Sequence, residues 1–576
     1  MLSYREYFEA EMRSLQDLAH EFADAYPEQA AMLNLNTVKD RDPYVERLLE
    51  GMAFLTSQIR HRLDDSVPEI SERLLDQIMP TMVRPYPANT VIQFTPNMQN
   101  KNAVSVAAGS VVKALNAGPL NANCSFTTSH DVEVQPLVLS HVIAQERAGG
   151  GCQIRLSLQK GAQASWEDIS LKGLKLYLSA DWPLAYALFH ALTDKQTHIK
   201  VELDSRGQVG SSQPILFRGA HQSAKDNLLP SHGRARSAFS IMHDYFCARE
   251  KYLFVESIGL DSLAIPVTCQ YLSLIIETQV ALPVDTQLTQ DNLRLYCAPA
   301  INLYKEDTEP VIVDHTKSEY RVNPDRQVAE YSSIYSIAEV NSRDQSTGET
   351  HFYSPMHAMR HRKQDDRVYS TGHRTAGVDK RLTYIALNCP PPFNPEVVSM
   401  AALLTNDQYP RRYLELGAVY KTSEDLGRQL TAKNVTRPSK MLRAPSFQDY
   451  QWQLVSLLSL NLSSLESVDT LQQLLSLFDW SEQLENQRKI EAIADIRTKT
   501  THRLRRGVLF QGLEISVELN ESGFSSLADM YLFGSVLHNF FSAFANMTEF
   551  VQTRVVQLPS YKEWTWSPVF GNKALF

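Results

Sequence analysis

The hydrophobic pattern of this chain changes its period near residues 84–87, and this change constrains the fold more than any other feature. Before it, apolar residues recur every three or four positions, as on the buried face of an amphipathic helix. After it, Val91, Gln93 and Thr95 alternate with Ile92 and Phe94, as on the two faces of a strand. Segregated helical and strand patterns predict an α+β fold.

The first eighty residues carry three amphipathic stripes. The first stripe has a charged opposite face, as expected for an amphipathic helix, and Pro27 indicates that this helix ends near that proline. Its apolar residues are Tyr4, Phe8, Met12, Leu15, Leu18, Phe22 and Tyr26. Asp42 and Pro43 suit the start of a second helix, whose apolar residues are Val45, Leu48, Met52, Leu55, Ile59 and Leu63. A third is expected from about Glu69 to Met79.

These stripes present more apolar surface than three isolated helices can bury. The helices can pack as a bundle on the body of their own chain, or the bundle can be completed by another chain. The pattern alone favours the first interpretation, because most apolar helical faces serve the core of their own protein.

The middle of the chain, residues 89–390, reads as β-rich and possibly as two subdomains. The expected strands share alternating or continuous apolar residues between turn signals, and they are Val132–Glu146, Gln153–Leu158, Ile169–Leu178, Ile199–Leu203, Tyr252–Val255, Tyr271–Thr278 and Leu382–Leu387. Short helices are expected at Pro183–Leu192 and Phe239–Cys247. The polar, charged segment Gln345–Thr375 is predicted to be a long loop.

Residues 391–576 read as a mixed region. Trp452, Val455, Leu458 and Leu462 fit one helix, and Leu471 to Phe478 fit the next. Strands are expected at Arg503–Leu509, Leu513–Leu519 and Phe550–Leu558, with an apolar helix from Leu527 to Phe544 and a tail that contains Trp564 and Trp566. The predicted architecture is therefore a multidomain α+β protein with an N-terminal helical region (1–88), a large β-rich middle and a mixed α/β C-terminal region. A length of 576 residues agrees with several cores.

Composition narrows the class of partner. The formal net charge is −9, from 56 basic and 65 acidic residues, which argues against nucleic acid as the main partner. The opening residues lack the pattern of a secretory signal, and no run of 18 apolar residues occurs, so we expect a cytoplasmic protein. The six cysteines lie far apart without a CxxC pair, which predicts buried thiols rather than disulfides or zinc ligands.

No catalytic signature is present in the sequence. It has no GxxxxGK[ST], GxGxxG, HExxH or GxSxG motif. The strongest metal candidate is His351 with His357 and His361, but cationic neighbours such as Arg360 and Arg362 oppose a bound dication. We therefore predict no enzyme activity, no cofactor and no metal. Catalytic carboxylates can come from distant positions, so a soluble β-rich carbohydrate-binding protein or hydrolase remains the alternative.

Several long segments resemble the TssF family (also called VasA or ImpG) of bacterial type VI secretion systems. They are spread in order along the chain, and they are Tyr7–Leu33, Asp42–Ala88, Asp244–Leu260, Cys297–Asp325 and the C-terminal run through GLEISVELNESGF and LADMYLFGSVLHNFFS to Trp566. The resemblance is weakest between about residues 100 and 230 and in Gln345–Thr375.

The resemblance implies a structural wedge subunit of a cytoplasmic baseplate docked at the inner-membrane complex. Two copies would join one TssG and contact each other, and the wedge would bind TssK and TssE around the spike hub to start tube and sheath assembly. Contact with the membrane would be indirect, through TssK and the membrane complex. The resemblance also favours a helical bundle shared with TssG, with partner-binding residues Tyr4, Phe8, Met12, Leu15, Phe22, Val45, Leu48, Met52, Leu55 and Ile59.

Overall fold

The computed structural model describes residues 8, 12, 13, 15, 47–57 and 75–571, with gaps. The gaps are residues 49, 77, 148–149, 205–207, 210–213, 223–225, 231–236, 284–285, 357–366, 377–379, 392–393, 446–447, 458–466, 506–507 and 546–548. The chain divides into two compact units: residues 1–83 with 445–459, and residues 84–444 with 460–576. None of the described helices is long and apolar enough to cross a lipid bilayer.

The smaller unit is helical where it is described. The described residues between 47 and 57 are helical, η1 (Pro80–Met82) is a single 3-10 turn, and α8 spans Gln448–Leu457. The Tyr450 hydroxyl of α8 donates a hydrogen bond to the Met82 carbonyl oxygen at 3.0 Å, and both residues are buried. The sequence pattern correctly predicts helix here, and it does not reveal that two segments so far apart in the chain share one unit.

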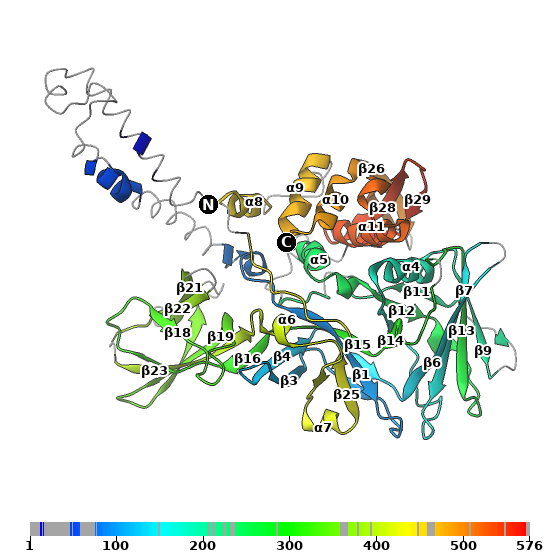
Figure 1. Cartoon of the computed structure of the whole chain (residues 1–576), viewed down its shortest axis with the longest axis horizontal. Coiled ribbons are helices and arrows are strands. Elements are labelled where there is room, and N and C mark those ends of the chain that lie inside the picture. The colour runs from blue at the N-terminus through cyan, green and yellow to red at the C-terminus, as the bar shows by residue number, and fades with distance from the viewer. Residues whose placement is uncertain are drawn as a thin grey trace, which may run out of the picture. The chain divides into compact units, whose positions relative to one another are not determined.

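The larger unit contains several antiparallel sheets (Figure 1). A six-stranded sheet has the order β24 (Val419–Tyr420), β25 (Leu430–Asn434), β1 (Asn89–Pro96), β15 (Cys297–Ile301), β4 (Ala122–Thr128), β3 (Val111–Ala117). The central strand β1 carries the alternation at residues 91–95, and Val91, Ile92 and Phe94 are buried on it. Pairing of β1 with β25 crosses the boundary expected at residues 390 and 391.

The larger unit contains two further sheets, built from residues 137–295. The first is β10 (Gln208–Val209), β9 (His198–Leu203), β13 (Tyr271–Thr278), β7 (Cys152–Lys160), β6 (Leu137–Glu146). The second is β11 (Leu216–Gly219), β12 (Phe254–Ile258), β8 (Lys175–Leu178), β14 (Leu293–Leu295). Strand β13 has the bounds that the sequence predicts.

Three of the expected strands in this region are wrong in extent. The expected strand Tyr252–Val255 begins two residues early, because Tyr252 ends the 3-10 turn η3 (Arg249–Tyr252) and β12 starts at Phe254. The expected strand Val132–Glu146 is broken at Gln135 and Pro136 into β5 (Val132–Val134), which pairs with β2 (Val104–Val106), and β6. The expected strand Ile169–Leu178 is strand only in its last four residues, β8. Ile169 and Leu171 are buried in irregular chain between two turns, so they show the alternation of a strand without pairing in a sheet.

The segment Gln345–Thr375, predicted to be a long loop, contributes two strands to an eight-stranded sheet, and residues 357–366 within it lie outside the described residues. The sheet contains β16 (Tyr304–Asp307), β23 (Glu396–Thr405), β19 (Ser333–Asp344), β20 (Thr350–Pro355), β21 (Val368–Ala376), β22 (Lys380–Asn388) and β18 (Tyr320–Val322), with β17 (Val311–Val313) on β23. The prediction is wrong because β20 buries only Tyr353 and exposes its remaining residues wholly or in part. Its sequence therefore lacks the apolar alternation of a strand.

The C-terminal sheet is built around a long hairpin and a βαβ unit. It comprises β26 (Ile493–Arg505), β27 (Val508–Asn520), β28 (Glu549–Leu558), β29 (Glu563–Thr565) and β30 (Val569–Phe570). The expected strand Arg503–Leu509 is wrong, because it spans the end of β26 and the start of β27. Strands β27 and β28 are parallel and are joined through α11 (Leu527–Ser542).

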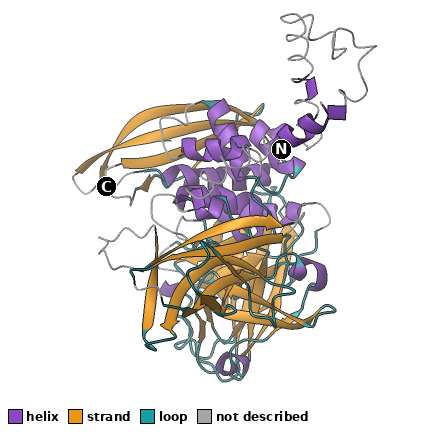
Figure 2. Cartoon of the chain, turned by 90° about the vertical axis from the view of Figure 1, so that its left-hand side faces the viewer, coloured by secondary structure: helices purple, strands orange, loops and turns teal. Residues whose placement is uncertain are grey.

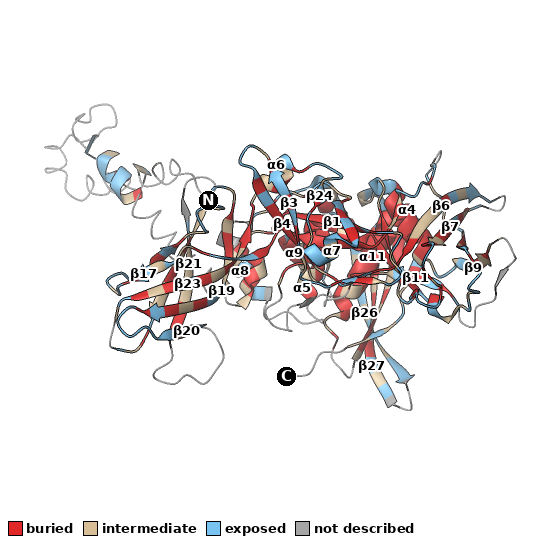
Figure 3. Ribbon diagram, turned by 90° about the horizontal axis from the view of Figure 1, so that it is seen from below, coloured by how far each residue is buried: buried red, intermediate tan, exposed pale blue. Residues whose placement is uncertain are grey.

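A helical layer lies between the C-terminal sheet and the sheet that contains β12 (Figure 2). The layer includes α4 (Trp182–Thr193), α5 (Ser237–Cys247) and α11, with α9 (Val468–Phe478) and α10 (Leu484–Glu491) beside them. The remaining described helices of the larger unit are short, and they are α6 (Tyr409–Tyr413), α7 (Glu424–Gly427), η3 (Arg249–Tyr252), η4 (Leu260–Ser262) and η6 (Glu521–Gly523). The Ser526 hydroxyl caps α11 by accepting the Asp529 amide at 3.1 Å. Buried residues concentrate in α4, α11 and β1 (Figure 3).

The fold confirms the α+β class, with helices at the N-terminal end, a β-rich middle and a mixed C-terminal region. All six cysteines are free and buried, as the sequence predicts. Burial raises the pKa of the Cys124 thiol to about 12 and that of the Cys152 thiol to about 11, so both remain protonated at neutral pH.

Candidate assembly interface

The helix at residues 47–57 presents an apolar face to solvent. Leu48, Met52 and Leu55 are 68%, 48% and 59% exposed. Spacings of four and three residues place these side chains within one narrow sector of a helix, since each residue turns the helix by about 100°. Three of the predicted partner-binding residues therefore form one continuous apolar strip, which we call the Leu48 strip.

The opposite face of this helix is buried and carries small residues. Ala53 and Ser57 are fully buried, and the Ser57 hydroxyl donates to the Phe54 carbonyl oxygen at 2.8 Å. A helix that served only its own core would bury its large apolar residues and expose the small and polar ones. The reverse holds here, so the helix has surface for contacts on two sides.

The Leu48 strip has a measurable energetic cost while it is exposed. Fully burying a leucine or methionine side chain contributes roughly 1.5–3 kcal/mol. About half to two thirds of each of Leu48, Met52 and Leu55 is still available for burial. Covering the strip would therefore stabilise a complex by about 4 kcal/mol before the cost of association.

The remaining predicted interface residues are only partly described. Phe8, Met12 and Leu15 are helical and half-buried, and their spacing places them on one face, as the first stripe predicts. Tyr4, Phe22, Val45 and Ile59 lie outside the described residues. The structure thus brings Leu48, Met52 and Leu55 together, and the wider ten-residue set stays a prediction.

The sequence pattern misplaces the buried face of a second helix in the same unit. Trp452 on α8 is 59% exposed, whereas Tyr450 and Leu454, four residues apart, are buried. The predicted helix face at Trp452 and Val455 is therefore not the buried one. An exposed tryptophan on a helix is the kind of residue that dominates binding energy at interfaces, so Trp452 is a second, separate candidate for partner contact.

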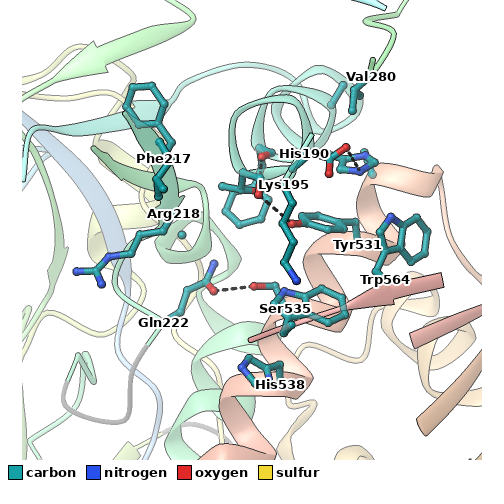
Figure 4. A pocket seen from close by; sticks show the side chains of 18 of the residues that line it. His190, Lys195, Phe217, Arg218, Gln222, Val280, Tyr531, Ser535, His538 and Trp564 are labelled. Carbon is teal, nitrogen blue, oxygen red and sulfur yellow. Dashed lines mark hydrogen bonds and ion pairs between the residues drawn. The ribbon is translucent and has the colours of Figure 1, made fainter. Parts of the chain in front are cut away.

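The larger unit contains a cavity of about 1480 Å³, whose lining residues are candidates for a ligand-binding or catalytic site (Figure 4). Tyr531, Ser535 and His538 line it from α11, His190 lines it from α4, and Trp564 lines it from β29. The rings of His190 and Tyr531 are stacked with centroids 4.4 Å apart. The cavity wall is therefore an aromatic cluster with polar groups between the rings.

The polar groups of this wall are held by structural contacts. Ser535 donates its hydroxyl to Gln222 Oε1 at 2.9 Å, so it is not presented to a histidine as a nucleophile would be. Burial lowers the pKa of His190 to about 4, although Asp194 opposes the shift. Burial likewise lowers the pKa of His538 to about 4, and its Nδ1 lies 3.1 Å from Thr553 Oγ1. Both rings are neutral at pH 7.

The histidines that the sequence offers as a metal candidate do not form a described site. His351 lies on β20, and His357 and His361 lie outside the described residues. A different cluster, His130, His221 and Asp226, is assembled by the fold from two separate segments. No sequence spacing announces it, because its members come from different connections between strands and helices.

Comparison with known proteins gives a consistent assignment. A family profile described as "Type VI secretion system, TssF" matches residues 2–573. The type VI secretion system component TssF1 of Pseudomonas aeruginosa PAO1 is 27% identical over 603 residues, which covers 95% of each chain.

Two solved structures are similar over nearly their whole length. A chain of the TssK-TssF-TssG baseplate subcomplex, determined by cryo-electron microscopy, has a TM-score of 0.79 and 28% identity, over 91% of this chain and 98% of that one. A chain of the baseplate complex from the type VI secretion system has a TM-score of 0.66 and 25% identity, over 99% of this chain and 100% of that one.

Proposed function

This chain belongs to the TssF family of the type VI secretion system, and from that premise we propose that it is a non-catalytic wedge subunit that assembles with TssG and TssK. The observation that carries the proposal is the exposed Leu48 strip. A stable interface needs buried apolar side chains at its centre, and this strip supplies three of them on one helix face.

We propose that the N-terminal helices complete a bundle with TssG, with the Leu48 strip and the Phe8–Leu15 face at the contact. In a bundle, side chains spaced by four and three residues interdigitate with those of neighbouring helices. The small residues Ala53 and Ser57 on the other side of the helix allow a second element to approach its backbone closely. One helix can then contact two neighbours.

Two copies of this chain per TssG, and contact between the copies, are part of the proposal. A single TssG offers two different environments, so the same helix of the two copies meets different surroundings. We also propose that the wedge contacts TssE and the spike hub, and that it lies in the cytoplasm at the inner-membrane complex. The carbohydrate-binding alternative has no comparable support, since the family and the structural neighbours are secretion baseplate components.

Co-expression with the cognate TssG tests the proposal. Replacing Leu48 and Leu55 by Asp places two charges in the proposed bundle, and burying an unpaired carboxylate costs several kcal/mol, so TssG should no longer co-purify. Arg47 is the matched control: it lies on the same helix with its side chain 82% exposed, and Arg47→Asp should leave the complex intact.

The two variants separate interface from fold. If Leu48→Asp/Leu55→Asp is folded by circular dichroism and still retains TssG in full, the strip is not the contact. If Arg47→Asp abolishes binding equally, the effect of the aspartates is electrostatic and general rather than specific to the strip.

A further inference from the structure

Strand β11 is an edge strand that lies along the large cavity. It ends the four-stranded sheet, and among the described strands it pairs with β12 alone. All four of its residues, Leu216 to Gly219, line the cavity. The free edge of a strand carries backbone N–H and C=O groups that can pair with another strand. The cavity therefore has a wall on which a further strand can form.

The register of β11 on β12 shows which backbone groups point to the free edge. The Ala220 amide, directly after β11, donates to the Phe254 carbonyl oxygen at 2.9 Å. Opposite residues of an antiparallel ladder alternate between hydrogen-bonded and non-hydrogen-bonded pairs. Arg218 therefore bonds to β12 as Ala220 does, whereas Phe217 and Gly219 turn their N–H and C=O groups away from β12. Each of these two residues offers one donor and one acceptor at the edge.

A buried amide donor lies beside this edge. Gln222 is 5% exposed, and its Oε1 accepts hydrogen bonds from the Ser535 hydroxyl at 2.9 Å and from Asn539 Nδ2 at 3.1 Å. Its Nε2 makes no hydrogen bond to any described residue, and it points away from Ser535 into the cavity (Figure 4). A Cβ atom built on Gly219 would lie 2.5 Å from this nitrogen, so the donor and the open edge adjoin. A buried amide needs an acceptor, which water or a ligand has to supply here.

The outer face of β11 leaves apolar side chains uncovered. Leu216 and Ile258 are opposite each other in the β11–β12 register, and they are 42% and 37% exposed. On a sheet, side chains of directly opposite residues on adjacent strands contact each other. A strand added to β11 would place one of its side chains beside Leu216. An apolar residue at that position would cover surface that is now in water.

The size and charge of the cavity indicate the class of ligand. Its volume of about 1480 Å³ exceeds the roughly 300–1,000 Å³ of pockets that hold small molecules. Tyr531 and Trp564 lie across the cavity from Phe217 (Figure 4). Charges of both signs line it, and they are Lys175, Lys195, Arg218, Lys562, Asp194, Asp226, Glu256 and Glu563. An extended peptide of mixed composition fits such a cavity better than a polyanion or a small molecule does.

We propose that β11 binds an extended segment of TssG, which adds to the four-stranded sheet as a fifth strand. The segment bonds to the backbone of Phe217 and Gly219, supplies an acceptor to Gln222 Nε2 and carries an apolar residue beside Leu216. The assignment to TssG rests on the proposed function, in which TssG is the chain that joins two copies of this protein. The site lies in the larger unit, so it is a second contact in addition to the Leu48 strip of the smaller unit.

Hydrogen exchange, measured residue by residue by mass spectrometry on the full chain alone and in its complex with TssG, tests the proposal. The amides of Phe217 and Gly219 should exchange about tenfold or more slowly in the complex, because they gain hydrogen bonds. The amides of Arg218 and Ala220 bond to β12 in both states, so they are the reference within the same segment. Gln222→Glu keeps an acceptor for Ser535 and removes the free donor, so it should reduce the added protection of Gly219 by about tenfold.

The matched control is Gln196→Glu, the same substitution at an exposed glutamine of the cavity, and it should leave the protection unchanged. If the complex with TssG forms and the amides of Phe217 and Gly219 exchange as in the free chain, this inference is wrong while the proposed function stands. If no complex forms, the proposed function itself fails. Protection that appears only when TssK is added would overturn the assignment to TssG, and equal effects of Gln196→Glu and Gln222→Glu would overturn the role of the Gln222 donor.

Discussion

A buried ion pair within the segment Asp244–Leu260 gives a quantitative test of how this chain is held together. The side chains of Asp244 and Lys251 are each 1% exposed and form an ion pair. The Asp244 carboxylate also accepts hydrogen bonds from the Tyr86 hydroxyl at 2.8 Å and the Leu228 amide at 3.2 Å. This part of the family-like sequence therefore builds the core.

Replacing Lys251 by Met keeps most of the buried stem and removes the charge. The carboxylate of Asp244 would remain buried with only neutral donors, and removing one partner of a buried pair costs about 3–5 kcal/mol. Because two hydrogen bonds to Asp244 persist, we expect the lower end, about 3 kcal/mol. Adding Asp244→Asn to Lys251→Met should recover part of this loss, since it removes the uncompensated charge.

The assay is urea unfolding followed by tryptophan fluorescence and circular dichroism. Lys305→Met is the control, because Lys305 and Glu339 form an ion pair with both side chains more than half exposed. Such surface pairs contribute less than about 1 kcal/mol. If Lys251→Met shifts the free energy of unfolding no more than Lys305→Met does, the buried pair does not support the core as argued.

Other predictions concern the interface, the polar segment and acid stability. Phe8→Asp with Leu15→Asp should abolish co-purification with TssG; retention of TssG by the folded variant would refute a shared bundle. His357→Ala with His361→Ala should leave assembly intact, and loss of assembly together with loss of bound metal would show a site there. Burial lowers the pKa of His243 to about 4 despite the opposing Asp244, so the unfolded chain takes up the proton first as pH falls from 6.5 toward 4, and stability is lost over that window. His243→Phe should reduce the acid loss between pH 7 and 5 by about 2 kcal/mol in urea unfolding, and an unchanged pH profile would contradict this.

The sequence predicts best those elements whose periodicity reflects burial. Strand β13 is buried at alternate positions along most of its length and lies between two partners, so its bounds follow from the sequence. The helix predicted at Leu527–Phe544 is found as α11, which is buried nearly all round. Both are segments in which local pattern and tertiary environment agree.

Elements with an exposed face or an unusual turn are the ones that sequence reasoning misplaces. Strand β20 buries one residue, so its sequence is mostly polar and does not show the pattern of a strand. The turn between β26 and β27 is missed because Leu504 and Leu509 near the tip of the hairpin are apolar although they are exposed. The candidate site divides in the same way. Periodicity identifies the Leu48 strip, but the cluster of His130, His221 and Asp226 depends on tertiary contacts that no local spacing encodes.

The most direct test of the wedge assembly is the intact mass of the complex that forms when this chain is co-expressed with its cognate TssG. We expect a stable assembly of two copies of this chain with one TssG, which is lost with Leu48→Asp/Leu55→Asp and kept with Arg47→Asp. A soluble lone monomer that ignores TssG would contradict it.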